Sequence, residues 1–302
     1  MAIDVNALGA YVDEQRLPLI KKAVIGSKSA SLFNLQTGVK NKAKLNLLST
    51  AVTFGDGSTC GFNAAGTSTL SQREIAAGNV KINMTFCDKD LLSTWADHEV
   101  KVAAGTATMP FEQDFVEGVL KSANAKLEKG LWQGDTTSLN ADLNKFDGLL
   151  KILAAEASVI EPALSTAPAT VKEAVNAVYA AIPVEVLETA SIVVGQDMFR
   201  TYVMELAAAN LYQYKPEVDG QMELVIPGTS TKIYGLGGLN GTNTIVAADL
   251  AGNVFYGTDL EGDQEKFDLW YSKDNQEFRL AINFVAGVQV AFPDQVVMYV
   301  MA

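Results

Sequence analysis

The residues that could do chemistry are few, and the first to consider is His98, the only histidine in the chain. Ser-His-Asp and Cys-His mechanisms need a histidine base, so either mechanism here would have to use His98. One histidine without a histidine or cysteine cluster is also poor evidence for a metal site. We therefore expect a structural role for His98 and no catalytic residue.

The chain has two cysteines, Cys60 and Cys87, and they do not form a Cys-x-x-Cys pair. This spacing gives almost no support for a zinc site or a redox motif. A disulfide between them and two free thiols both remain open, and free thiols in a reducing compartment are the simpler interpretation. We expect no metal and no cofactor.

Two short tracts resemble ligand-binding loops only superficially. Acidic residues alternate in GTDLEGDQEKFD, from Asp259 to Glu265, but the spacing lacks the glycine and glutamate of a calcium-binding EF-hand. The tract YGLGGLNGTN lacks the last glycine of a phosphate-binding G-x-G-x-x-G loop, because Asn240 stands there. We interpret the first tract as a solvated acidic loop and the second as a turn.

Composition limits the class of partner. The chain has 302 residues, 48% of them hydrophobic, and its 23 Lys+Arg against 35 Asp+Glu give a net charge of −12. This balance disfavours a general nucleic-acid binder, which needs a basic face. No stretch is apolar over the roughly 20 residues that a membrane span requires, and the first residues do not resemble a signal peptide. We expect a soluble, cytosolic chain.

The best-marked helix runs from Met109 to Asp135. Pro110 suits a first helical turn, and Phe111, Phe115 and Val119 recur at helical spacing. Gly130 is expected to end the helix. We expect its apolar stripe to pack on the C-terminal strands.

An extended region precedes this helix. One run covers 39–54, four glycines follow between 55 and 66, and a second run continues from Thr69 to Phe86, which predicts one long two-stranded projection. Residues 3–25 read as two short helical pieces hinged at Pro18. A lone hairpin and a thin helix are both marginal in water, so each needs a surface to lie on.

The rest of the chain alternates between helices and strands. We expect a helix over 168–182, a buried strand over 191–194 and a helix from Phe199 onward, because their apolar residues follow the helical and strand periods. From Met222 the chain is rich in strands, with alternating apolar residues from Phe278 to Phe284 and again after Gly287. The fold class is α+β.

Taken in order, these elements resemble the major capsid proteins of tailed bacteriophages, which share the Hong Kong-phage shell fold. The resemblance is carried by the long helix ending in LWQGD (131–135), FDGLL (146–150), the helix 170–182, VVG (193–195) with DMFR (197–200), IPGT (226–229), VFYGTDL (254–260) and the strand tract 278–292. It covers nearly the whole chain, and the ordered succession is what makes it specific.

The resemblance implies a division of the chain. The expected parts are an N-terminal arm (1–34), an extended loop formed by a long β-hairpin (35–86), a peripheral domain with a spine helix (87–135), an axial domain (136–254), peripheral strands (255–292) and a C-terminal strand (293–302) that returns toward the axial domain. No long charged helical segment precedes the arm, so we expect a separate scaffolding protein.

The resemblance also implies partners. We expect the chain to assemble with itself into hexamers and pentamers of a virion head, with portal and accessory head proteins, in the host cytoplasm and without a membrane. DNA would be enclosed without sequence-specific binding. Candidate inter-subunit contacts are Lys40, Lys42, Lys44, Asp56, Phe62, Glu112, Asp114 and Glu117, although a merely solvated face fits the three lysines equally well.

Two other functions remain open. An encapsulin-type compartment shell resembles the same fold and would need an inward pocket for cargo peptides. A monomeric α+β enzyme would need His98 to meet the acidic loop in a cleft.

Overall fold

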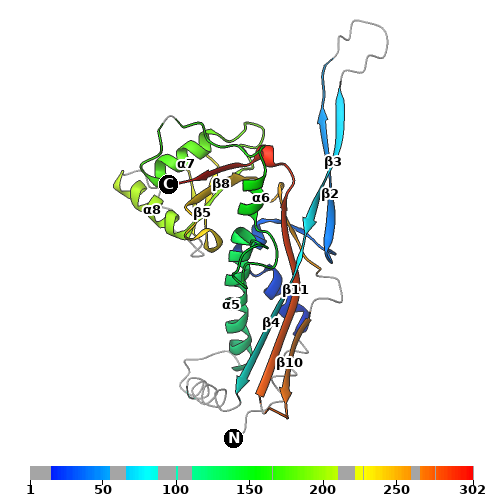
Figure 1. Ribbon diagram of the computed structural model, residues 1–302. Coiled ribbons are helices and arrows are strands. Elements are labelled where there is room, and N and C mark those ends of the chain that lie inside the picture. Colours follow the sequence, from blue (N-terminus) through cyan, green and yellow to red (C-terminus); the bar gives the residue numbers. More distant parts are fainter. Residues whose placement is uncertain are drawn as a thin grey trace.

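The computed structural model describes residues 15–54, 66–87, 100, 111–164, 166–209, 222–226, 228–259, 266–275 and 277–301, with the side chains of residues 16, 17 and 111–115 left aside. The molecule is elongated (Figure 1). A long sheet runs beside the helix α5, a rounder α/β unit lies beside the upper end of that helix, and the ribbon of β2 and β3 projects beyond both.

The strand β11 (Glu277–Val290) is the centre of the long sheet. It pairs with β10 (Lys266–Ser272) and β4 (Gly78–Cys87) along its first part, one on each side, and with β9 (Val254–Gly257) along its last residues, 287–290. The short strand β1 (Asn34–Gln36) adds to β9 in parallel. The alternating apolar residues of β11, from Phe278 to Phe284, are at most 3% exposed, as expected where one face of a strand packs on the core.

β11 runs without a break through Gly287, which lies between the two alternating apolar tracts of the predicted strand region. β11 is continuous and changes partner at that point, from Gly78 opposite Ala286 to Gly257 opposite Gly287. A Cβ at Gly287 would lie 2.6 Å from the carbonyl oxygen of Ala76, so the glycine lets the β3–β4 junction cross closely over β11.

The helix α5 (Phe111–Gln133) covers this sheet. It continues through Gly130, where the sequence predicted its end, because Gly130 packs against Phe146, and it stops at Gly134, whose N–H donates to the Gly130 carbonyl at 2.9 Å. Val116 and Leu120 are buried in the same core as Leu280, Ile282 and Phe284, with Val119 partly buried beside them. The side chains of Phe111 and Phe115 lie outside the described set, so their predicted packing stays a prediction.

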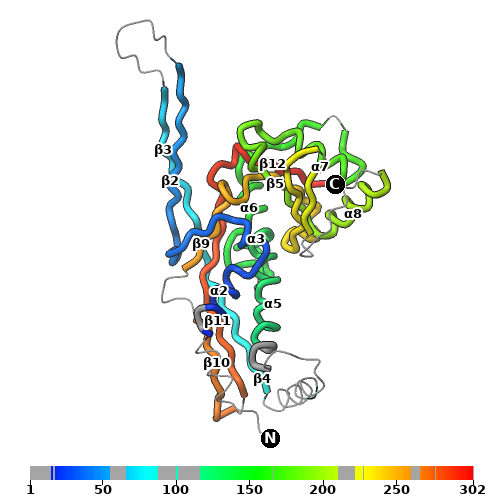
Figure 2. Tube along the Cα trace, turned by 180° about the vertical axis from the view of Figure 1, so that it is seen from behind, coloured from blue at the N-terminus to red at the C-terminus, as the bar shows by residue number. Residues whose placement is uncertain are grey.

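The N-terminal helices α2 (Arg16–Ile25) and α3 (Lys28–Leu32) lie against α5 and the long sheet of their own chain (Figure 2). Leu19, Ala23 and Val24 are buried there. Pro18 lies in the first turn of α2, and the break between the described helices falls at Gly26, not at Pro18. The helical piece predicted before Pro18 lies mostly outside the described residues.

A buried polar network fixes α3 to α5. The carboxylate of Glu128 accepts hydrogen bonds from the Ser29 N–H at 2.9 Å and from the Ser29 hydroxyl at 2.5 Å. The Ser29 hydroxyl in turn accepts the indole N–H of Trp132 at 2.7 Å. The buried carboxylate therefore accepts from two donors of Ser29, and Trp132 fixes the position of the Ser29 hydroxyl.

The rounder unit is a second sheet in the order β12-β8-β5-β7-β6. Its strands are β5 (Ser191–Gly195), β6 (Glu223–Val225), β7 (Lys232–Leu236), β8 (Thr244–Ala248) and β12 (Val297–Val300), with α7 (Val171–Ala180) and α8 (Gln196–Ala208) packed on it. The Thr170 hydroxyl caps α7. The expected helix, strand and helix are all present, and β12 brings the C-terminal segment into this sheet.

The projection is shorter than the sequence suggested. β2 (Lys42–Ala51) pairs with β3 (Thr67–Ala76), but the second predicted run divides at Ala77, and its latter half is β4, which pairs with β11 instead. The two strands β3 and β4 follow one another almost in line (Figure 1). The ribbon therefore spans 42–76, and residues up to Cys87 belong to the long sheet.

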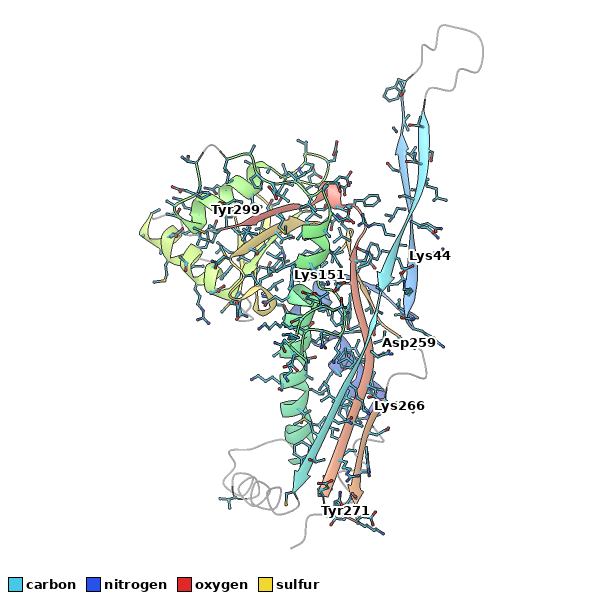
Figure 3. The ribbon with its side chains drawn as sticks, viewed as in Figure 1. Lys44, Lys151, Asp259, Lys266, Tyr271 and Tyr299 are labelled. Atoms are coloured by element: carbon cyan, nitrogen blue, oxygen red, sulfur yellow. The ribbon has the colours of Figure 1, made fainter. Side chains whose placement is uncertain are left out.

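The two parts of the body join at an elbow between α5 and α6 (Leu149–Ala155). Gly134 and Gly148 lie face to face there, with the Gly148 N–H donating to the Gly134 carbonyl at 2.8 Å. Lys151 bridges Asp135 at 2.7 Å and Asp147 at 2.6 Å (Figure 3). Hydrogen bonds from Lys151 and Thr137 lower the pKa of Asp135 to about 2, and the two carboxylates raise the pKa of Lys151.

Because the backbone is closely packed at the elbow, adding one methyl group at Gly148 should lower the stability of the subunit. A Cβ at Gly148 would lie 2.5 Å from the Gly134 nitrogen and 2.7 Å from the Trp132 carbonyl oxygen, so Gly148→Ala should lower the melting temperature of the unassembled subunit by several degrees. The matched control is Gly118→Ala in α5, where nothing lies within 4 Å and alanine should stabilise the helix by up to about 1 kcal/mol. Equal melting temperatures for the two variants would contradict the close contact.

The cluster of Asp135, Asp147 and Lys151 should make the stability of the subunit depend on pH in the acid range. Because the folded-state pKa of Asp135 is about 2, below its ordinary 3.8, the ionised carboxylate stabilises the fold above about pH 4 and this contribution is lost as the pH falls toward 2. Asp135→Asn should therefore melt below the wild type at pH 7, and the difference should close by pH 2 in a thermal melt series. A difference that stays constant from pH 7 to 2 would show that the charge is not responsible.

Candidate interaction surfaces

The residues singled out for chemistry do not form a site in the described structure. His98, Cys60 and the acidic residues from Glu261 to Glu265 lie outside the described residues. Cys87, at the end of β4, is exposed and free. Asp259 is 1% exposed and therefore buried, not part of a solvated loop. Within the described ranges no cluster of three or more histidine, cysteine or acidic residues is placed to hold a metal ion.

The glycine-rich tract packs closely against α5. It forms the end of β7 and the short 3₁₀ turn η1 (Gly237–Leu239), as the prediction of a turn requires. A Cβ at Gly238 would lie 2.3 Å from the carbonyl oxygen of Glu128 and 2.4 Å from the Trp132 ring. The Gln133 amide donates to the Gly238 carbonyl at 2.6 Å. The tract therefore seats the second sheet on α5 and has no room for a phosphate there.

The lower half of the ribbon is anchored on its own body. Leu45 and Leu47 of β2 and Ile75 of β3 are buried in a small core with Ala291, and Phe255 and Phe292 cover it. Arg73 forms an ion pair with Glu156 at the end of α6, and burial lowers the pKa of the Arg73 guanidinium. One face of the lower ribbon is thus fixed to both the long sheet and the elbow helix.

The upper half of the ribbon has no core. Leu48 and Leu70 are cross-strand partners, yet they are 63% and 70% exposed. Val52 and Phe54, further along, are 76% and 98% exposed. The remaining described residues of this half carry hydroxyl, amide or small side chains and no charge. We call Leu48, Val52, Phe54 and Leu70 the distal patch.

The predicted lysine face is only partly present. Lys42 and Lys44 lie in β2 and are exposed, but Lys40 precedes the strand in a bend, so two lysines and not three share the face. Lys42 pairs with Glu74 of the same ribbon at 2.5 Å, and Lys44 stands directly opposite Glu74 (Figure 3). Much of this charge is therefore balanced within the ribbon.

The described part of α5 carries both acidic and basic side chains on its surface. In the part whose side chains are described, Lys121, Lys126 and Lys129 face solvent, and Glu117 forms an ion pair with Lys22 of α2 at 3.2 Å. The side chains of Glu112 and Asp114 lie outside the described set, as do Asp56 and Phe62. The role of Glu112, Asp114 and Glu117 as contacts with a neighbouring subunit stays a prediction.

A groove of about 680 Å³ lies between α5 and β4, and no sequence pattern predicted it directly. Val80, Ile82 and Met84 line it from the strand. Val119, Ala123 and Leu127 line it from the helix, and Lys126, Asp142 and Lys145 add the charged groups. The alternation of Val80, Ile82 and Met84 predicts a strand with one apolar face. The sequence interpretation places this strand in the projecting hairpin, whereas in the structure it pairs with β11 beside α5.

Comparisons with known proteins agree on the architecture. No family model matches the chain, and no curated protein does. Among solved structures, a chain of the satellite phage P4 procapsid including size determination (Sid) protein has a TM-score of 0.62 at 12% identity, covering 97% of this chain and 95% of that one. A chain from the capsid of an empty GTA particle has a TM-score of 0.55 at 11% identity, with 93% and 90% covered. A virus-like particle from Pyrococcus furiosus has a TM-score of 0.50 at 10% identity, with 94% and 97% covered.

These likenesses cover nine-tenths or more of each chain, so they identify the fold. It is an elongated α+β architecture, with a long sheet and helix, a second sheet unit and a projecting ribbon. More particularly, the chain has the tailed-phage major capsid fold, as the resemblance in the sequence implied. A search of the described helices finds none long and apolar enough to cross a membrane.

Two adjacent leucines test which face of the ribbon is anchored. Leu47 is 8% exposed and Leu48 is 63% exposed. Leu47→Asp should destabilise the ribbon base by about 2–4 kcal/mol, because it places a carboxylate in the small core, whereas Leu48→Asp should leave the subunit's stability unchanged. Proteolysis of the ribbon in the unassembled subunit is the measurement, and equal cleavage rates for the two variants would contradict the assignment of faces.

Proposed function

We propose that this chain is the major structural protein of an icosahedral phage head, assembling with copies of itself into the shell. The observation that carries the proposal is the upper ribbon, which projects from the body with its large apolar side chains uncovered. An isolated two-stranded ribbon is marginal in water, so it gains its stability from another molecule. The similarity to chains of a procapsid and a capsid supports a copy of the same chain as that molecule.

The proposed division of labour follows the architecture. The long sheet and α5 form the peripheral domain, with α5 as its spine helix, and the unit of β5–β8 and β12 forms the axial domain, which would meet its copies around fivefold and sixfold centres. The ribbon is the extended loop. Residues 1–34 form the N-terminal arm, of which α2 and α3 stay on their own body.

Assembly would depend on many weak contacts. Each exposed ion pair contributes roughly 0–1 kcal/mol, and a single ribbon contact is small, but closure of the shell makes every further contact intramolecular in effect. No residue has a catalytic role in this account. Separate scaffolding, portal and accessory head proteins would guide assembly in the host cytoplasm, and the net charge of −12 suits a virion shell that encloses DNA without gripping it.

A second shell function has one specific observation in its favour. The similarity to the Pyrococcus furiosus virus-like particle at a TM-score of 0.50 is compatible with an encapsulin-type compartment. The contents of purified particles separate the two, since a head contains DNA and a compartment contains protein cargo.

The test is electron microscopy of the purified chain in negative stain. We expect rings or closed shells from the wild type, and from a variant lacking residues 55–66 we expect folded subunits with an unchanged melting temperature but no shells, because the ribbon can no longer reach its neighbour. Dispersed 32.2 kDa subunits from the wild type at high concentration would contradict the proposed function. Normal shells from the deletion variant would contradict the role given to the ribbon.

A further inference from the structure

The side of α5 that faces away from the long sheet carries a row of exposed lysines. The long sheet lies on one side of the helix only (Figure 1), and the residues that pack on it are apolar. The exposed side presents Lys121, Lys126 and Lys129. Positions 121, 125 and 129 are neighbours on a helix surface, so the row is about 12 Å long at the helical rise. We call these three lysines the α5 lysine face.

The ammonium groups of this face are little used within the chain. Lys126 forms an ion pair with Asp142 at 3.1 Å, but the two side chains are 60% and 55% exposed, and such a pair contributes little. Lys121 and Lys129 have no hydrogen-bond or ion-pair partner among the described residues. The face is therefore open to a partner from outside.

Lysines of neighbouring elements extend the face on both sides. Lys22 of α2 lies beside the helix, because it pairs with Glu117 at 3.2 Å. Lys145 is exposed and lines the groove beside α5. Among the described side chains the acids of this surface are Glu117 and Asp142, since Glu128 is buried against α3. Five lysines against two carboxylates make the surface locally positive.

The acidity of the chain lies elsewhere. Residues 156–205, which include much of the unit with the second sheet, hold seven acidic side chains and two basic ones. The net charge of −12 is thus an average over a basic helix face and an acidic second unit. The composition disfavours nucleic-acid binding by the chain as a whole, but local charge decides what one face attracts.

The residue types of the face favour phosphate groups over a protein partner. Protein interfaces are depleted of lysine and depend on large apolar or aromatic anchors. Between the lysines this side of α5 has Gly118, Ser122 and Ala125, which supply no anchor and let a partner approach closely. Lysine binds phosphate as a point charge. A DNA duplex carries one charge per about 1.7 Å of its axis, so several phosphates fit along the row.

We propose that the α5 lysine face, together with Lys22 and Lys145, contacts the phosphate backbone of double-stranded DNA without regard to sequence. The inference rests on the proposed function, because DNA is what a head encloses, and it adds which surface of the subunit the DNA touches. Five lysines neutralise at most about five phosphates, so one subunit binds weakly and the many copies of a shell act together.

The salt dependence of DNA binding tests the proposal. The full-length chain, below the concentration at which particles form, is titrated into a fluorescent duplex of about 30 base pairs at several salt concentrations, and anisotropy gives the affinity. Lys121→Gln combined with Lys129→Gln should make the slope of log K against log salt less steep by about 2, since each lost phosphate contact removes about one unit. The melting temperature should not change, because both side chains are exposed and glutamine is a comparable helix former.

Two matched variants separate the face from net charge. Lys40→Gln combined with Lys273→Gln removes the same charge from exposed positions at the ribbon base and in the β10–β11 turn, and it should leave the slope unchanged. Lys121→Arg combined with Lys129→Arg keeps the charge of the face and should also keep the wild-type slope.

Three results would overturn the contact. They are a wild type that binds no DNA at the lowest salt concentration, an equal change of slope in both glutamine variants, and displacement of the duplex by polyglutamate at an equal concentration of charges, which would show an acidic protein as the better partner. Shells formed by a wild type that binds no DNA would leave the proposed function standing. DNA binding that depends on the α5 lysine face, by a chain that forms no shells, would support the contact and reject the shell.

Discussion

The ribbon of β2 and β3 has two faces, and the described residues of the chain cover only the lower half of one of them. There Leu45, Leu47 and Ile75 are buried against the end of β11, while above them Leu48 and Leu70 are left in solvent. A two-stranded ribbon has no interior of its own, so the uncovered half depends on another molecule for its stability. The proposed assembly follows from this requirement.

The body that carries the ribbon is held by close backbone contacts. Gly134 meets Gly148 at the elbow, Gly238 sits on α5, and Gly287 admits the β3–β4 junction. At each of these points a single Cβ would overlap a backbone atom. The ion pairs of Lys151 and Arg73 add charge-assisted links at the same joints. The ribbon thus projects from a body whose two sheets are fixed to each other, and its direction is defined.

The sequence was sufficient for the elements with strong periodicity and weak at the places where the chain changes partner. The alternation from Phe278 and the helical stripe of α5 predicted their structures because burial dictates both patterns. The division of one apparent strand into β3 and β4, the continuation of α5 past Gly130 and the groove beside Met84 depend on contacts distant in sequence. The ion pairs of Lys42 with Glu74 and of Glu117 with Lys22 could not be predicted either, because charge pattern alone does not show which elements lie side by side.

The central claim is that the chain is built to assemble, and sedimentation velocity over a range of concentrations tests it directly. Closure makes partial assemblies unstable relative to complete ones, so above a threshold concentration the account predicts two populations, free 32.2 kDa subunits and fast-sedimenting closed particles, with little between them. A single 32.2 kDa species at every concentration, with the ribbon intact, would contradict it.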